Sequence, residues 1–176
     1  SFLRFAATGG RERTRVSLGT MLDEITRLVR KEAEWRKVAV ETAIEGDDPT
    51  IDADVESIRA ALLNLVLNAF EAMPDGGTLA LVVRREGDEA VVEVRDTGVG
   101  IPEDERDRVF DFAYSTRDGG SGLGLAIVHQ CVVEDHGGRI SLDSEVGRGT
   151  TITLRLPDAD DDVGVSDPPE PPEMPA

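Results

Sequence analysis

Apolar residues recur along the chain at two spacings, which divide it into helices and strands. Spacing by three and four residues predicts an amphipathic helix over about 18–35 and a second over 55–73, capped by Asp54. A third predicted helix, over about 122–136, ends at two glycines. Shorter apolar or alternating runs predict strands and extended pieces over 14–18, 37–44, 49–53, 78–85, 89–95, 139–144 and 150–156.

The order of these elements predicts the fold class. The strands over 78–85 and 89–95 are joined at Glu86-Gly87-Asp88 in the manner of an antiparallel hairpin. Helices and sheets bury their apolar faces against one another. We therefore expect an α/β domain, a two-layer sandwich in which a mixed, mostly antiparallel sheet is covered by helices on one face. Leu28 and Trp35 are expected to pack from the first helix into this core.

The charge of the chain excludes several classes of partner. The formal net charge of −17 repels DNA, RNA and anionic membranes, and an aromatic content of 4% argues against stacking on single-stranded nucleic acid. Seven acidic residues and no basic residue lie in the Pro-rich stretch 157–176, a composition that predicts a disordered tail. The single cysteine, Cys131, excludes an internal disulfide, fits a reducing compartment and is expected to be a buried small hydrophobe.

Two asparagines stand four residues apart in the second helix. Asn64 and Asn68 therefore project from one side of a helix that is otherwise apolar. An asparagine carbonyl oxygen is a suitable ligand for a Mg²⁺ ion whose charge is already neutralised by phosphates. Taken alone, the pair fits equally well two polar side chains that cap or cross a core and find hydrogen-bond partners there.

A second motif, DTGVG followed by Ile101, comes directly after the strand over 89–95. An ionised carboxylate such as Asp96 can accept a hydrogen bond from the exocyclic amine of adenine, whereas guanine presents a carbonyl oxygen at that position. Gly98 and Gly100 would leave room for a flat base against the backbone. Taken alone, the motif is more often a simple Asp-Gly loop than a base-binding site.

A third motif, GGSGLGL over residues 119–125, opens the third helix. Backbone N–H groups at a helix start attract phosphate, so this stretch is a candidate phosphate-binding loop. It is not a dinucleotide fingerprint, because Leu125 stands where GxGxxG requires glycine, and no Gly-Lys-Ser/Thr of a P-loop follows. Each motif alone is weakly diagnostic, but their order and spacing together are specific.

Together, these motifs resemble the catalytic domain of sensor histidine kinases. The resemblance rests on the asparagine pair, DTGVG, RVFDFAYSTR, GGSGLGLAIV and HGGRISLDSEVGRGTTITLRLP, and it covers about residues 11–157. It implies the Bergerat-type α/β fold that this family shares with gyrase, Hsp90 and mismatch-repair ATPases. Residues 108–117 resemble the family's phenylalanine box, with Phe110 and Phe112 on its aromatic positions, and this box separates histidine kinases from the hydrolysing relatives.

The resemblance also implies roles for individual residues, with ATP and Mg²⁺ as ligands. Asn68 would coordinate Mg²⁺, Asn64 would support the phosphates, and residues 102–121 would form a mobile lid. Asp96 would bind the adenine amine, with Thr150 assisting through water. The full set implied to bind the nucleotide comprises Asp96, Gly98, Gly100, Ile101, Phe110, Arg117, Ser121, Gly122, Leu123, Gly124 and Thr150.

One position bears on the reaction. The hydrolysing members of the superfamily place a glutamate, which activates water, four residues before the magnesium asparagine, and here that position is Asn64. We therefore expect the γ-phosphoryl group of ATP to be transferred, as in the family, to a histidine on a separate helical hairpin upstream of a response regulator. His129 and His136, the only histidines here, are expected to be structural, the latter as a cation at a helix C-terminus.

The expected organisation has three parts. Residues 1–10 would be the end of the dimerisation and phosphoacceptor helix with its linker, 11–157 the ATP-binding catalytic domain, and 158–176 the acidic tail. The fragment is expected to be a cytoplasmic monomer, whether or not its parent is anchored in a membrane. The alternatives are an ATP-hydrolysing switch of the chaperone or topoisomerase kind and a degenerate nucleotide-binding module used for docking. An anti-sigma-factor serine kinase shares the fold, but the phenylalanine box speaks against it.

Overall fold

A computed structural model describes residues 12–111 and 124–159 of the chain. Its main sheet has five strands in the order β2-β4-β5-β7-β6. Strands β2 and β4 are parallel, and every other neighbouring pair in this sheet is antiparallel. The mixed, mostly antiparallel sheet predicted from the sequence is therefore confirmed. The strands are Val38–Glu45 (β2), Gly77–Glu86 (β4), Glu89–Asp96 (β5), Arg139–Glu145 (β6) and Gly149–Pro157 (β7).

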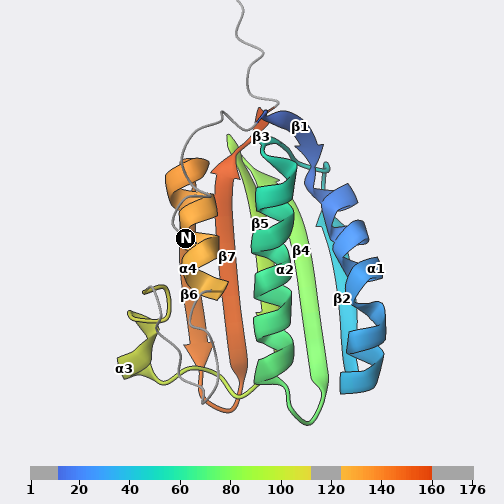
Figure 1. The fold of residues 1–176 in the computed structure, drawn as a ribbon, viewed down its shortest axis with the longest axis vertical. Helices are drawn as coiled ribbons and strands as arrows, with labels where there is room; N and C mark the ends of the chain where they lie inside the picture. Colours follow the sequence, from blue (N-terminus) through green and yellow to red (C-terminus); the bar gives the residue numbers. More distant parts are fainter. Residues whose placement is uncertain (1–11, 112–123, 160–176) are drawn as a thin grey trace, which may run out of the picture.

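Helices cover one face of this sheet, as Figure 1 shows. They are α1 (Leu18–Arg36), α2 (Val55–Ala72) and α4 (Gly124–His129), and the short α3 (Glu103–Arg106) lies beside β6. A small antiparallel sheet of β1 (Thr14–Ser17) and β3 (Thr50–Ala53) closes one end. The arrangement is the predicted two-layer α/β sandwich.

The predicted third helix differs from the observed one in its second half. After α4 the chain continues as a π-helix over Gln130–Asp135 and ends at His136. The carbonyl oxygen of Cys131 accepts a hydrogen bond from the Nδ1–H of His136 at 2.6 Å, which competes with the regular α-helical backbone pattern at this point. Cys131 itself is buried, as predicted.

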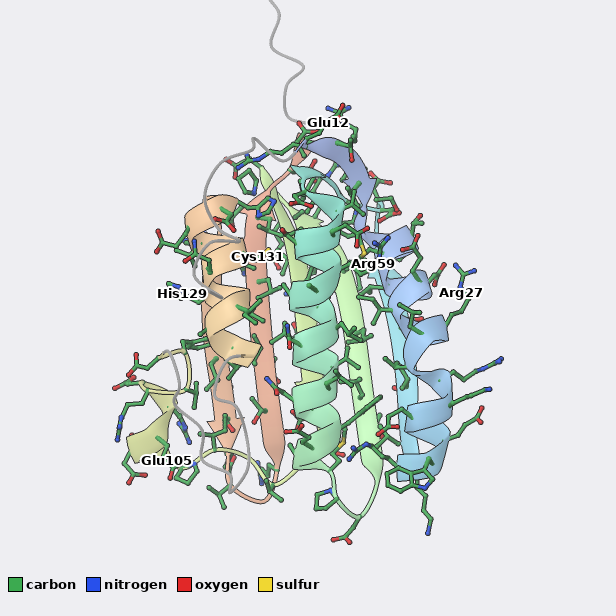
Figure 2. The ribbon with its side chains drawn as sticks, viewed as in Figure 1. Glu12, Arg27, Arg59, Glu105, His129 and Cys131 are labelled. Carbon is green, nitrogen blue, oxygen red and sulfur yellow. The ribbon has the colours of Figure 1, made fainter. Side chains whose placement is uncertain are left out.

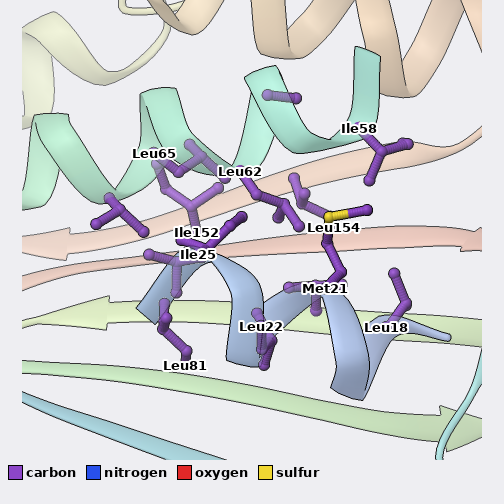
Figure 3. Close-up of a cluster of buried hydrophobic side chains, with 14 of the residues drawn as sticks. Leu18, Met21, Leu22, Ile25, Ile58, Leu62, Leu65, Leu81, Ile152 and Leu154 are labelled. Atoms are coloured by element: carbon purple, nitrogen blue, oxygen red, sulfur yellow. The ribbon is translucent and has the colours of Figure 1, made fainter. Parts of the chain in front are cut away.

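The core lies between the helices and the sheet, and it shows why α1 and α2 form where they do. Side chains spaced three and four residues apart on both helices meet the alternate residues of the strands. In Figure 3 these side chains form one cluster, whose labelled members are Leu18, Met21, Leu22, Ile25, Ile58, Leu62, Leu65, Leu81, Ile152 and Leu154. Both helices begin at a capping side chain: Ser17 accepts from the Thr20 amide, and Asp54 accepts from the amides of Glu56 and Ser57.

Two predicted core residues are wrong. Leu28 is 64% exposed and Trp35 is 75% exposed. The stripe of α1 that meets the core includes Met21, Leu22, Ile25, Val29 and Ala33, and Leu28 and Trp35 lie outside it. An apolar residue at helical spacing was therefore not sufficient evidence of burial.

The sheet face away from the helices carries a chain of ion pairs. Arg84 contacts Glu86 at 2.6 Å, Arg155 bridges Glu86 at 2.7 Å and Glu89 at 3.2 Å, and Arg139 contacts Glu89. The hydrogen bonds from Arg84 and Arg155 hold the pKa of Glu86 below its ordinary value. Those from Arg139 and Arg155 lower the pKa of Glu89 in the same way. Charged side chains of this face thus pair with one another.

The packed chain continues two residues beyond β7, where the catalytic domain was expected to end. Asp158 is buried and its carboxylate pairs with Arg85 at 2.7 Å. The carbonyl oxygen of Ala159, also buried, accepts a hydrogen bond from Arg15 of β1 at 2.8 Å. The chain therefore leaves the domain next to β1, near the start of α1 (Figure 1).

Among the described residues, no helix combines the length and the apolar character that a membrane span requires.

Candidate functional site

The loop after β5 is held between two other parts of the fold. Asp96 is the last residue of β5, is 8% exposed, and accepts a hydrogen bond on Oδ1 from the Gly98 amide at 2.8 Å. The Val99 amide donates to Ala72, the last residue of α2, at 2.9 Å, and the Val99 carbonyl accepts from the Gly147 amide at 2.8 Å. The loop is thus tied at once to α2 and to the turn between β6 and β7.

Ser144 is the centre of a second set of bonds to this loop. It is 4% exposed; its Oγ accepts from the Ile101 amide at 2.8 Å and donates to the Gly149 carbonyl at 3.1 Å. Thr150 Oγ1 lies 2.8 Å from the same oxygen. Because the single hydroxyl proton of Ser144 is donated to the Gly149 carbonyl, the Thr150 hydroxyl is the donor to Ser144 Oγ. The Thr150 oxygen therefore offers acceptor sites, next to Asp96, its partner in the β5–β7 register.

Ser144 was not among the predicted site residues. It lies in β6, within the stretch HGGRISLDSEVGRGTTITLRLP that contributes to the family resemblance, but the resemblance assigned it no role. The only signal is the pairing of Ser144 with Thr150 across the β6–β7 hairpin, which needs the register of the sheet. We call the residues Asp96–Ile101, Ser144 and Thr150 the loop end of the site.

The two glycines of the loop end are required by the protein's own backbone. An added Cβ at Gly98 would stand 2.4 Å from the Ala72 carbonyl oxygen. One at Gly100 would stand 2.2 Å from the Glu145 carbonyl oxygen, and the φ of +73° at Gly100 is itself unfavourable for a side chain. Close approach of α2 and of the β6–β7 turn thus explains both glycines, and the clearance for a base stays a prediction.

A second group of predicted residues meets where α2 faces the start of α4. An added Cβ at Gly124 would lie 3.3 Å from Asn68 Nδ2 and 3.5 Å from Asn64 Oδ1, so all three residues are in contact distance. Asn64 donates its Nδ2–H to the Ala60 carbonyl, one turn earlier, at 2.9 Å, which leaves its amide oxygen for other partners. Within 12–111 and 124–159 the side-chain amide of Asn68 makes no hydrogen bond. We call Asn64, Asn68 and Gly124 the amide end of the site.

The amide end offers neutral oxygens rather than carboxylates. In the part of the chain that the structure describes, no three or more His, Cys, Asp or Glu side chains gather to hold a metal ion. A cation at the amide end would therefore need most of its ligands from a bound anion or from water.

Phe110 lies against α4. Its ring centroid is 6.4 Å from that of His129, with a tilt of 48° between the rings. This contact gives His129 a packing role, in agreement with the structural role expected for it.

His136 bridges two elements through its ring. Its Nε2 accepts from the Asp54 amide at 3.3 Å and its Nδ1–H donates to the Cys131 carbonyl. Both contacts give His136 the structural role that was expected for it.

The remaining predicted residues cannot be placed. Arg117, Ser121, Gly122 and Leu123, together with Phe112, lie outside the described residues, as does the second half of the predicted lid, residues 112–121. Of the predicted set, the structure thus brings Asp96, Gly98, Gly100, Ile101 and Thr150 together at one end of α2, and Asn64, Asn68 and Gly124 along the side of α2 that faces α4.

Comparison with known proteins extends this description. Residues 53–160 match the family model described as histidine kinase-, DNA gyrase B- and HSP90-like ATPase. The sensor histidine kinase ZraS of Escherichia coli K12 is 37% identical over 142 residues, which are 81% of this chain and 30% of ZraS. The chain therefore spans about a third of the length of that relative.

Solved structures give the same picture for the fold. The catalytic domain of the histidine kinase ThkA in a nucleotide-free form superposes with a TM-score of 0.77 at 26% identity, covering 83% of this chain and 95% of that one. Full-length ShkA in complex with AMPPNP superposes with a TM-score of 0.79 at 28% identity, covering 88% of this chain and 33% of ShkA.

Proposed function

This chain belongs to the family of histidine kinase-, DNA gyrase B- and HSP90-like ATPases, and from that premise we propose that it binds Mg-ATP and passes the γ-phosphoryl group to a histidine on a separate helical hairpin. Within the family, the similarity to ZraS and to the ThkA catalytic domain supports a histidine kinase domain. The observation that carries the proposal is the position of Asp96, a buried carboxylate at a strand end beside a second acceptor, Thr150.

At the loop end, the Asp96 carboxylate accepts a hydrogen bond from the exocyclic amine of adenine. The loop around it is held by its own hydrogen bonds, so the carboxylate is in position before any ligand arrives and little ordering is required on binding. The Thr150 oxygen, whose proton is engaged by Ser144, accepts a hydrogen bond from a water molecule that also contacts the base. Gly98, Gly100 and Ile101 border the base from the backbone side.

At the amide end, the donor set fits a magnesium ion that arrives with the nucleotide. Mg²⁺ prefers oxygen ligands, keeps several waters and commonly takes few ligands from the protein when phosphates supply the rest. The Asn68 amide oxygen is the proposed protein ligand, and Asn64 holds a phosphate or a metal-bound water. When bound, the ion would neutralise charge on the phosphates. Gly124, with Ser121, Gly122 and Leu123, contributes backbone N–H groups to the phosphates, and Arg117 and Phe110 complete the nucleotide contacts.

The reaction is transfer rather than hydrolysis. Asn64 stands four residues before Asn68, and an amide cannot take a proton from water as a glutamate can. Positioning and charge stabilisation are then the main contributions of this chain to phosphoryl transfer. The chain spans only 30% of ZraS. We therefore include in the proposal an acceptor hairpin and a downstream response regulator that are separate from this chain. We also propose that this part of the protein is cytoplasmic and monomeric.

The domain limits follow the same reasoning. We propose that residues 1–10 end the preceding helix and its linker, and that the nucleotide-binding domain begins at 11. Asp158 and Ala159 pack with it, so its end is shifted from 157 to 159 and the acidic tail begins at 160.

Label transfer tests the proposal. The chain is mixed with γ-labelled ATP, Mg²⁺ and the helical hairpin of its parent protein, and the label is expected on the hairpin. A hairpin with its acceptor histidine replaced by alanine is expected to stay unlabelled. The chain with Asp96→Asn is expected to transfer less label to the hairpin when ATP is below saturation. Steady phosphate release without a labelled hairpin would indicate a hydrolysing switch instead. Absence of any heat on titration with Mg-ADP would indicate a degenerate docking module.

A further inference from the structure

The second half of α1 is a cationic surface on an acidic protein. Five of the 19 basic residues of the chain, including both lysines, lie within residues 27–37, against two acidic ones, which makes this segment +3 in a chain of net charge −17. The five are Arg27, Arg30, Lys31, Arg36 and Lys37. Arg27 extends from α1 away from the domain in Figure 2.

Two large apolar side chains are exposed on the same segment. Leu28 and Trp35 are 64% and 75% exposed and stand seven residues apart, which places them on one side of the helix. Arg36 lies over the Trp35 ring at 5.6 Å, and Glu32 holds Arg36 at 2.5 Å, so the indole is already oriented. Arg27 and Lys31 beside them form no ion pair with any other residue that the structure describes. An exposed tryptophan and leucine next to such cations are typical of an interaction surface.

We propose that this surface, formed by Arg27, Leu28, Lys31 and Trp35, docks residues 160–176 of the same chain. That segment contains six acidic residues, no basic residue and five prolines. Its charge is complementary to the surface, in a molecule that is otherwise acidic. Proline-rich segments favour the extended polyproline conformation and dock on exposed aromatic rings at a low entropic cost, and Trp35 is the one tryptophan of the chain.

The point at which the segment leaves the domain supports this occupant. Ala159 is bonded to Arg15 on β1, and β1 leads directly into α1 at Leu18. From Leu18 to Trp35 the helix rises about 26 Å. Seventeen residues in an extended proline-rich conformation span about 50 Å. The segment therefore starts beside the N-terminal end of α1 and is long enough to run along the helix past Trp35.

Tryptophan fluorescence of the full chain reports on this surface alone, because Trp35 has no competing indole. In one variant the six acids of the segment become amides (Asp160→Asn, Asp161→Asn, Asp162→Asn, Asp167→Asn, Glu170→Gln and Glu173→Gln). Relative to the unmodified chain, we expect its emission to shift to longer wavelength and its quenching by acrylamide to rise. Lys31→Glu on the surface is expected to produce the same shift.

The controls separate docking from unrelated changes. Arg148→Glu, a charge reversal at an exposed residue of the β6–β7 turn, is expected to leave the emission unchanged. Salt near 1 M, where the Debye length is about 3 Å, should shift the unmodified chain but not the amide variant. Circular dichroism verifies that all variants are folded, and no nucleotide is needed, so the result is independent of the proposed kinase activity.

Two outcomes would overturn the proposal. Equal emission and equal quenching of the unmodified chain and the amide variant at low salt would mean that the segment does not cover Trp35. An emission shift that grows with protein concentration, together with a doubled molar mass in light scattering, would mean that a second copy of the chain occupies the surface.

Discussion

The two ends of the candidate site are built in different ways. At the loop end, backbone groups of three segments are joined by hydrogen bonds through Ser144, Gly98 and Val99, and glycines allow contacts too close for a side chain. At the amide end, two side-chain amides of α2 face the first residue of α4, and the Asn68 amide has no protein partner in the part of the chain that the structure describes.

This difference indicates which end is preorganised. The loop end satisfies its polar groups within the protein, so its geometry exists before a ligand binds. The amide end leaves hydrogen-bonding capacity that a ligand has to satisfy, and its side chains can adjust. Substitutions should therefore affect folding and binding together at the loop end, and binding more than folding at the amide end.

The largest effect is expected for Gly100→Ala. A Cβ there would stand 2.2 Å from a backbone oxygen at a φ of +73°, so the left-handed conformation and the crowding together should cost about 2–5 kcal/mol of the free energy of unfolding. Gly147→Ala is the matched control, because Gly147 has a φ of +82° with nothing within 4 Å of its Cβ position. Urea unfolding measures both variants, and equal losses would show that crowding is unimportant.

The amide end provides the counterpart to this experiment. The atom nearest to an added Cβ at Gly124 is the end of the Asn68 side chain at 3.3 Å, which can move, and alanine favours a helix over glycine. Gly124→Ala should therefore change the free energy of unfolding by less than about 1 kcal/mol. A loss as large as that of Gly100→Ala would show that the amide end is as rigid as the loop end.

The next largest effect is expected for binding in Asp96→Asn. The new carbonyl oxygen can still accept the Gly98 amide, so the loop should fold, but the charge-assisted bond to adenine is lost. That bond is worth about 1.5–3 kcal/mol, or roughly 10- to 100-fold in the Kd for Mg-ADP measured by calorimetry. Asp143→Asn, at an exposed carboxylate of β6, should bind normally. Unchanged affinity of Asp96→Asn would contradict the proposed adenine contact.

Ser144→Ala should have a smaller effect, on both the free energy of unfolding and the affinity for Mg-ADP. It leaves the part-buried Ile101 amide and the buried Gly149 carbonyl without their hydroxyl partner, at a cost of about 1–2 kcal/mol in the free energy of unfolding. Affinity for Mg-ADP should fall as well, since Thr150 loses the partner that orients its hydroxyl. Ser141→Ala, at an exposed serine of the same strand, is the control. If the two variants were equally stable, Ser144 would not organise the loop end.

The smallest effect is expected outside both ends, on the open face of the sheet. Arg84 and Arg155 lower the pKa of Glu86 in the folded chain, so its ion pairs stabilise the fold above its ordinary pKa, and this contribution is lost as the pH falls through the lowered value. Glu86→Gln should therefore be less stable than the unmodified chain at pH 7, and the difference should disappear once the pH falls below the lowered pKa of Glu86, as measured by thermal unfolding. Its affinity for Mg-ADP should not change, and a pH-independent stability difference would rule out the ion-pair explanation.

Most of the fold could be predicted because its signals are local. The cap at Asp54, the hairpin at residues 86–88 and the glycines after His136 each act within a few residues, and the structure has elements at those positions. The prediction of burial was wrong where it rested on helical spacing alone. Leu28 and Trp35 have the right period for a core helix, yet the sheet meets only the neighbouring stripe of α1.

The candidate site divides in the same way. The sequence by itself determined its chemistry: a carboxylate at the end of a strand, two amides one helical turn apart, and asparagine where a general base would otherwise stand. Only the tertiary structure decided that Ser144 joins the loop end, why Gly98 and Gly100 must be glycine, and that the acidic segment begins at the same end of the domain as α1, whose cationic face lies outside the core. Residue types and short spacings are properties of neighbouring positions, whereas contact between distant segments depends on strand register and on which helix face the sheet leaves to solvent.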